Sequence, residues 1–197
     1  HLAFDGPGEL GTRGTRADQA AGHDLGAGPV QARWPLLHLH PRSAGRQRFI
    51  SAQDEYSLYN RLAEDELVPA CERFGIGLFP YFPLAYGLLT GKYRRDAAAP
   101  EGSRLAKANQ AGRLAGANWD RIVALQAFAD ARDLPLLTVA IGGLAAQPAV
   151  ASVISGATRP EQIASNVAAG GWEPPAAVLA ELDELRRSIA FSYTTFA

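Results

Sequence analysis

IGLFPYFPLAYGLLTGKY, residues Ile76–Tyr93, is the stretch from which the fold of this chain is inferred. It opens on a short apolar run, Ile76–Phe79, which Pro80 and Pro83 are expected to end. A run of this length between breakers predicts a buried strand of a parallel sheet. Tyr81 follows at the point where the strand becomes a loop, which is where parallel α/β sheets bind ligands.

The loop after this strand has the composition of an anion-binding turn. It contains Gly87, Thr90, Gly91 and Lys92. Glycines allow backbone N–H groups to approach a ligand closely, and a threonine hydroxyl and an ammonium group suit phosphate oxygens. The sequence therefore favours a phosphate-binding loop, and the alternative is an ordinary glycine turn after a buried strand.

A second candidate site begins at SGATRPE, residues 155–161. Thr158 and Glu161 have the spacing of a capping box, so a helix is predicted to begin at Thr158. Gly156 precedes this helix, and its N-terminus can bind an anion to which Arg159 adds a fixed positive charge. Such a cradle suits the adenosine 2′-phosphate that distinguishes NADP from NAD. The alternative is an ordinary capped helix.

The predicted helix has two distinct faces. Thr158, Gln162 and Asn166 are spaced at i, i+4 and i+8 and share a polar face. Ile163 and Val167 lie on another face, which we expect to pack on the sheet.

The remaining chain alternates between strand and helix patterns, which predicts a parallel α/β fold. Asn118 and Pro135 mark the starts of two helices, and Gly142 and Gly143 in the second should cost about 1 kcal/mol each relative to alanine. Besides the segments above, the predicted elements are a strand at Phe49–Leu58, a helix at Glu64–Phe74 with Pro69 in its first turn or at a kink, a polar surface excursion at Arg94–Asn118, helices at Trp119–Arg132 and from Pro135 to Gln147, a buried strand at Val150–Ile154, and a helix from Pro174 to Arg187.

Three separated segments resemble the aldo-keto reductase family, and specifically the bacterial branch that is similar to potassium-channel β subunits. They are ISAQDEYSL (residues 50–58), YFPLAYGLLTGKY (residues 81–93) and SVISGATRPEQIASN (residues 152–166). The resemblance implies an incomplete (β/α)₈ TIM barrel, in which the three predicted strands are roughly the sixth to the eighth. It runs from about residue 48 to about residue 188.

The resemblance also implies a binding site for NADP, in its reduced form NADPH. Gln53 matches the family residue that bonds the nicotinamide carboxamide, and Tyr81 matches the aromatic that stacks on the nicotinamide ring. The match to the loop over the pyrophosphate comprises Leu84, Gly87, Leu88, Thr90 and Lys92.

On the adenosine side, Thr158 and Gln162 match contacts to the phosphate and ribose, and Asn166 matches the adenine contact. Ser165 departs from the family, which commonly has an acidic residue there.

No catalytic residue is assigned. The family uses a tyrosine proton donor, a lysine, an aspartate and a histidine, and all four come from the first half of the barrel. His40 and His38 lie too close to Gln53 to match that histidine. The leading hypothesis is an NADP(H)-dependent reductase fragment, acting by family on aldehydes or ketones but catalytically incomplete alone. The alternatives are a non-catalytic nucleotide-binding or partner module and a non-functional truncated product.

Composition sets the remaining expectations. Residues 1–48 are rich in Gly, Arg and Pro without periodicity, so they are read as a disordered leader or as out-of-frame translation; residues 49–188 are the partial barrel, and 189–197 a loose tail. The net charge of −1 and the lack of a long apolar stretch argue against nucleic-acid and membrane partners. A single cysteine, Cys71, and no metal-ligand cluster outside the leader predict a cytoplasmic protein without a metal site.

Overall fold

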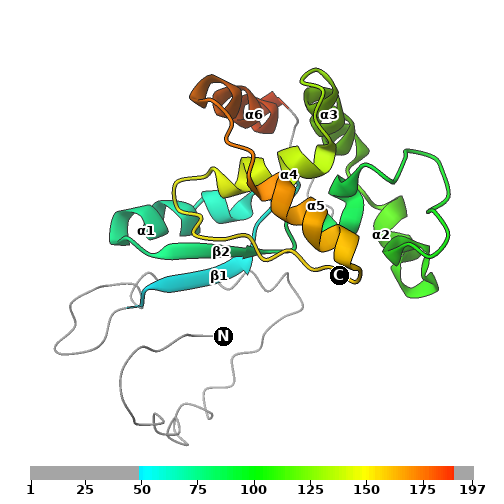
Figure 1. Cartoon of the computed structure of the whole chain (residues 1–197), viewed down its shortest axis with the longest axis horizontal. Coiled ribbons are helices and arrows are strands. Elements are labelled where there is room, and N and C mark those ends of the chain that lie inside the picture. Colours follow the sequence, from blue (N-terminus) through cyan, green and yellow to red (C-terminus); the bar gives the residue numbers. More distant parts are fainter. Residues whose placement is uncertain (1–48, 189–197) are drawn as a thin grey trace, which may run out of the picture.

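The computed structural model of the chain describes residues 49–188 (Figure 1). The predictions for the leader, including His38 and His40, and for the tail at 189–197 lie outside this range. The described elements follow one another in the order β1 (Ser51–Glu55), η2 (Leu62–Glu64), α1 (Leu67–Phe74), β2 (Gly77–Tyr81), η3 (Ala85–Thr90), η4 (Arg104–Ala106), η5 (Ala108–Gln110), α2 (Ala111–Ala115), α3 (Trp119–Asp130), α4 (Leu136–Ala145), α5 (Pro160–Gly170) and α6 (Ala176–Ser188).

β1 and β2 pair in parallel, as the alternation of strand and helix predicts. Ser51 pairs with Gly77, and the register continues to Glu55 opposite Tyr81. Because side chains alternate between the two faces, Gln53 and Tyr81 lie on the same face. The opposite face packs on α1. Both strands are thus found where the sequence places them, although β1 is five residues long rather than ten.

The prediction that Pro80 ends the second strand is wrong, because Pro80 lies inside β2 opposite Asp54. A proline lacks the N–H that would continue a ladder, but its carbonyl still accepts a hydrogen bond. The Pro80 carbonyl accepts from the N–H of Ile154 at 2.9 Å, and Pro80 is fully buried. The missing N–H therefore removes a possible hydrogen bond only between β2 and the Val150–Ile154 segment.

The predicted strand at Val150–Ile154 is not a regular strand. It touches β2 through two isolated parallel bridges, Leu78 to Val150 and Tyr81 to Ile154. Two residues of β2 lie between these bridges, whereas three residues of the partner do, so the ladder is interrupted beside Pro80. The segment is also not buried, since Ile154 is 43% exposed.

α1 covers the face of the sheet opposite Gln53 and Tyr81. Pro69 lies in its first turn, as predicted, where a missing N–H costs little. Gly75 ends the helix in the left-handed conformation. The buried residues between α1 and the sheet form one apolar cluster, which comprises Tyr56, Ala63, Val68, Cys71, Ile76, Leu78, Leu144 and Ala149.

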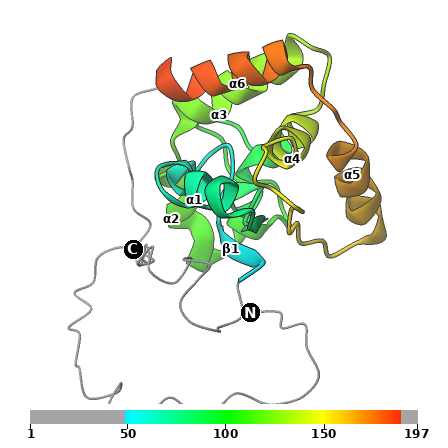
Figure 2. The ribbon, with the colours of Figure 1, turned by 90° about the vertical axis from the view of Figure 1, so that its left-hand side faces the viewer.

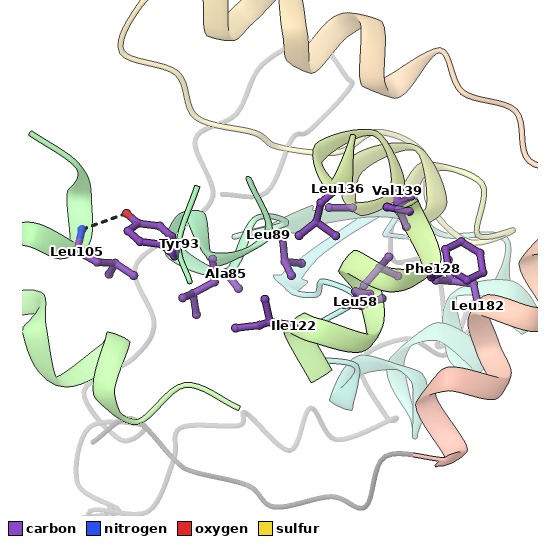
Figure 3. Packing of buried hydrophobic residues seen from close by; sticks show 14 residues of the cluster. Leu58, Ala85, Leu89, Tyr93, Leu105, Ile122, Phe128, Leu136, Val139 and Leu182 are labelled. Carbon is purple, nitrogen blue, oxygen red and sulfur yellow. Dashed lines mark hydrogen bonds between the residues drawn. The ribbon is translucent and has the colours of Figure 1, made fainter. Parts of the chain in front are cut away.

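A larger cluster fills the space among η3, α3, α4 and α6 (Figure 3). α3 begins as predicted, with the Asn118 side chain accepting from the N–H of Arg121 at 3.1 Å. α4 contributes to both clusters, with Val139 in the larger one and Leu144 in the smaller. The larger cluster consists of Leu58, Ala85, Leu88, Leu89, Tyr93, Leu105, Ile122, Leu125, Phe128, Ala129, Leu136, Val139, Ala140 and Leu182.

Gly142 and Gly143 make α4 narrow enough for its neighbours to approach closely. A Cβ atom on Gly142 would lie 2.7 Å from the Ala169 carbonyl oxygen and 2.9 Å from Trp172 Cβ. One on Gly143 would lie 2.9 Å from Leu182 Cδ2. The low helix propensity of this pair is therefore offset by the packing of α5 on α4 (Figures 1 and 2) and by the approach of the Leu182 side chain to Gly143.

The stretch Arg94–Asn118 is not the featureless surface excursion that its composition predicts. It contains the short helices η4, η5 and α2. Leu105 is only 1% exposed, and its N–H donates to the Tyr93 hydroxyl at 3.3 Å (Figure 3). Ala99, Leu114 and Ala117 of the same segment pack, partly buried, against the larger cluster. Apolar residues scattered in this way leave no periodic signal in the sequence.

α5 differs from its prediction at its start and on its apolar face. The helix begins at Pro160, with Arg159 as N-cap and no side-chain cap, so the predicted Thr158–Glu161 capping box does not form. Ile163 and Val167 are 57% and 71% exposed instead of packing on the sheet. α5 packs on α4 through its other side, where Ala169 is buried.

A buried charge network joins η2 to α6. Arg61 is 5% exposed and forms ion pairs with Glu64 and Asp183. The Tyr56 hydroxyl donates to Glu64 at 2.7 Å. Burial, and next the neighbouring Glu64 carboxylate, raise the pKa of Tyr56 far above the usual phenol value, so the hydroxyl remains a donor. Sequence periodicity cannot reveal the Arg61–Asp183 pair, because its partners lie 122 residues apart.

Among the described helices, none has the length and apolar content that crossing a lipid bilayer requires.

We predict that Gly142→Ala lowers the free energy of unfolding by about 2 kcal/mol, because the added methyl overlaps the Ala169 carbonyl and Trp172. Gly112→Ala is the matched control, since a Cβ there meets nothing within 4 Å and alanine favours the helix. Urea unfolding followed by circular dichroism measures both. Equal stability of the two variants would contradict the close approach of α5 to α4.

Cys71 is predicted to resist alkylation until the protein unfolds. It is buried, and burial, with a smaller contribution from Glu72, raises its thiol pKa to about 11. The pKa of an unfolded cysteine is about 8.5, so the free energy of unfolding should be level below that pH and fall as pH rises toward 11. Mass spectrometry after iodoacetamide treatment at pH 8, with and without urea, checks this; rapid labelling of the native chain would refute it.

Candidate functional site

The two candidate segments start side by side at the carboxyl end of the sheet. Tyr81, the last residue of β2, forms a parallel bridge with Ile154, which immediately precedes Ser155. In Figure 1 the arrowheads of the strands and the first turn of α5 lie on the same side of the molecule. The structure thus places the glycine turn after β2 and the segment before α5 at one sheet edge, where parallel α/β sheets bind ligands.

Gln53 and Tyr81 lie on the sheet face that α1 does not cover. Gln53 is exposed, and Tyr81 is half-buried. Burial, followed by the charges of Asp54 and Glu55, raises the pKa of the Tyr81 hydroxyl, so the ring remains neutral at physiological pH. An exposed amide and a neutral aromatic ring on one face can hold a flat polar ring by hydrogen bonding and stacking.

Asp54 is a polar residue of this edge that the sequence analysis did not select. Its carboxylate accepts from the N–H of Glu55 at 2.7 Å. Burial raises the pKa of Asp54, and this hydrogen bond partly opposes the rise.

The turn after β2 is built from left-handed backbone. Gly87 and Gly91 have φ values of 97° and 77°, which glycine adopts without strain. Phe82, Ala85 and Tyr86 also have positive φ, from 45° to 60°, which is costly for residues with a Cβ. A run of strained residues beside a sheet end is typical of a functional turn.

Hydrogen bonds hold this turn from within. The Thr90 hydroxyl donates to the Gly87 carbonyl at 2.7 Å. The Leu84 carbonyl accepts from the N–H of Gly87 at 2.8 Å and from that of Leu89 at 3.2 Å. Thr90 therefore shapes the turn through its hydroxyl hydrogen and retains oxygen lone pairs for a further donor.

The other two predicted residues of this loop differ in exposure. Leu88 is 1% exposed and belongs to the larger core cluster, so its side chain anchors the turn. Lys92 is exposed, and its Nζ lies 5.2 Å from the centre of the Tyr93 ring. Of these two, only Lys92 presents a side chain to solvent.

The segment before α5 combines an open backbone with a small polar network. At Gly156 an added Cβ would meet nothing within 4 Å. The Thr158 N–H donates to Gln162 Oε1 at 2.8 Å, and the Asn166 amide donates to the Ser155 hydroxyl at 3.0 Å. Of the predicted polar face only Gln162 and Asn166 lie on α5, because Thr158 precedes the helix; Thr158 contacts Gln162, whose side chain takes the acceptor role that the capping box assigned to Glu161.

Charge at the start of α5 is mixed. Arg159 is exposed at the N-cap position, and Glu161 lies in the first turn. The helix dipole and Arg159 both favour an anion there, whereas the Glu161 carboxylate opposes one. Arg159 is therefore needed if this end of the helix is to hold a phosphate.

Four residues of the site region were missed by the sequence analysis. Phe82 and Tyr86 pack on each other with ring centres 4.8 Å apart. The guanidinium groups of Arg104 and Arg113 lie 5.1 and 4.1 Å from the centre of the Tyr86 ring. Arginines in a polar stretch are expected to be exposed to solvent. Their aromatic partners are 18 to 27 residues away in the chain, so nothing in the sequence pattern indicated these contacts.

No group of three or more His, Cys, Asp or Glu side chains able to hold a metal ion occurs within residues 49–188. A pocket lined by Asp130, Asp133, Leu134 and Pro135 lies where α3 ends and α4 begins.

Residues 37–187 match the sequence model of the aldo/keto reductase family. A probable voltage-gated potassium channel subunit beta from Arabidopsis thaliana is 38% identical over 125 residues, which are 61% of this chain and 38% of that protein. The NADH-specific methylglyoxal reductase of Escherichia coli K12 is 36% identical over 117 residues, 59% of this chain and 36% of the enzyme. The chain thus spans little more than a third of the length of these relatives.

Among solved structures, aldo-keto reductase AKR11C1 from Bacillus halodurans, in its apo form, superposes with a TM-score of 0.55. The alignment covers 75% of this chain and 47% of that one, at 22% identity. At this identity the similarity supports a common fold.

Proposed function

The chain belongs to the aldo/keto reductase family, and from that premise we propose that residues 49–188 form the cofactor-holding, C-terminal part of an NADP(H)-dependent reductase barrel. Its strand segments would be roughly the sixth to eighth of eight. The reaction of the whole enzyme would be reversible reduction of a small aldehyde or ketone to an alcohol in the cytoplasm.

One observation carries this proposal. The Tyr81–Ile154 bridge joins the starts of two polar, glycine-containing segments that are 74 residues apart in sequence. A dinucleotide is long and has an anionic centre, so it needs contacts for a flat ring at one end, for phosphates in the middle and for a base at the other. The sheet edge offers groups of each kind in neighbouring positions.

The residues present fit the parts of the cofactor. Gln53 and Tyr81 would hold the nicotinamide ring on the uncovered sheet face. The turn from Leu84 to Lys92, with Gly87, Leu88 and Thr90, would lie along the pyrophosphate. The adenosine end would be held by Gly156, Thr158, Arg159, Gln162 and Asn166. Gly156, where a side chain would meet nothing, leaves room for close backbone approach to a ligand.

When bound, the nicotinamide would supply the hydride for carbonyl reduction. The described residues would position and shield it: the Tyr81 ring would cover one of its faces, and Gln53 would fix its orientation through a hydrogen bond. The proton for the carbonyl oxygen must come from a general acid. By resemblance that acid would be a tyrosine from the first half of the barrel, and we assign no such group within residues 49–188, so this chain alone should bind without efficient turnover.

Arg159 would decide between NADP and NAD. Its exposed guanidinium can pair with a 2′-phosphate, whereas NAD has only a ribose hydroxyl there. The matched reductase of E. coli is named as NADH-specific, so cofactor choice has to be tested on this chain directly.

A non-catalytic nucleotide-binding or partner module is the second candidate. The observation that favours it is the 38% identity to a protein named as a channel subunit. This candidate has the same binding site as the first. It differs because a binding module would function without the first half of the barrel, whereas a reductase would need it. If the separately expressed first half of an aldo-keto reductase restored turnover, that result would favour the fragment proposal over the module.

We predict that Arg159→Ala weakens NADPH binding by ten- to a hundredfold, since a charge-assisted hydrogen bond contributes about 1.5–3 kcal/mol, and leaves NADH binding within twofold. Gln162→Ala should weaken both. Titration followed by NADPH fluorescence measures the affinities. Arg73→Ala is the control, because it removes an equal charge from an exposed position at the other end of the sheet. Equal effects of the two arginine variants would contradict the proposed phosphate contact.

The unsubstituted chain is predicted to oxidise NADPH very slowly, or not at all, with a broad panel of aldehydes. Absorbance at the nicotinamide band measures the rate. A rate comparable to that of full-length reductases would show that a proton donor is present and would refute the proposal of catalytic incompleteness.

A further inference from the structure

Tyr86 lies at the centre of a cluster that joins the turn after β2 to the stretch 94–118, which we call the excursion. Its half-buried ring packs on Phe82 at an interplanar angle of 33°. Arg104 and Arg113, both from the excursion, bring their guanidinium groups to the same ring, and Arg104 also lies 5.9 Å from the Phe82 ring. Two segments of different structure thus meet at one aromatic side chain.

The attraction depends on the ring face. A guanidinium group is drawn to the negative face of an aromatic ring and stacks on it, whereas an aliphatic side chain of similar size offers no such field. The two arginines carry the same charge, and the ring face attracts each of them. The Tyr86 hydroxyl has no hydrogen bond among the described residues, and the ring therefore provides the contacts.

The backbone of the turn needs such an external hold. Phe82, Ala85 and Tyr86 occupy left-handed conformations that a residue with a Cβ adopts only when its surroundings enforce them. Phe82 and Tyr86 are two of these three, and both are contacted by Arg104. Leu105, which follows Arg104 in the chain, is buried in the larger core cluster and so fixes the backbone next to Arg104.

We propose that Tyr86 is a positioning residue: its ring locks the excursion to the turn and so keeps Thr90 and Lys92 in the geometry that binds the dinucleotide. Only the part of this inference that concerns dinucleotide binding rests on the proposed function. The lock itself is a property of the described contacts and can be measured without any ligand.

The test compares Tyr86→Phe, which keeps the ring, with Tyr86→Leu, which keeps only apolar bulk. Hydrogen exchange over residues 94–118, measured by mass spectrometry without ligand, should rise at least fivefold for Tyr86→Leu and remain within twofold for Tyr86→Phe. NADPH affinity should follow the same order, with at least a fivefold loss for leucine and rescue by phenylalanine.

Arg104→Gln provides a second route if Tyr86→Leu fails to fold. It should also speed exchange across the excursion, whereas Arg95→Gln, a matched exposed arginine paired with Asp120 instead of a ring, should not. Equal exchange in the leucine and phenylalanine variants would overturn the lock. Faster exchange with unchanged NADPH affinity would overturn the positioning role. If the unsubstituted chain bound no NADPH, the proposed function would fail, and the exchange data alone would decide the lock.

Discussion

Helix α4 is the constraint on which the described fold depends, because it has no polar face of its own. Its residues contribute to both apolar clusters, and its neighbours α3 and α5 contact it from different sides (Figure 2). Gly142 and Gly143 set the distances at which α5 and α6 pack. The placement of α5 then follows, and with it the position of Gly156, Thr158 and the rest of the segment before α5.

The candidate site combines a rigid part with a strained one. The sheet edge is fixed by backbone pairing, and the α5 segment is tied back to it by the Asn166–Ser155 hydrogen bond. The turn after β2, in contrast, has a backbone that is unfavourable in isolation and that the surrounding contacts must hold. Binding groups on such a turn depend on residues distant in sequence, which explains why the excursion matters to a site whose motif ends at Tyr93.

Sequence reasoning predicted the elements whose signals are local. The two parallel strands, the Asn118 cap and the first-turn Pro69 follow from patterns within a few residues. It failed where contacts with another element determine the structure. Pro80 continues a strand because only its carbonyl is needed for pairing. Ile163 and Val167 are exposed because α5 packs on α4 through its opposite side. The candidate site residues came from motif and family resemblance. The contacts of Tyr86 with the excursion came only from the structure.

The left-handed conformation of Ala85 bears on how many shapes the turn after β2 can adopt. Glycine there would relieve the backbone strain but would also remove a methyl group that is buried in the larger core cluster. The same change would let the turn sample many more shapes before a ligand arrives, and each ligand would then have to select one of them at an entropic cost. Alanine restricts the shapes open to the turn and packs in the core, so it favours a turn that is already ordered before any ligand arrives.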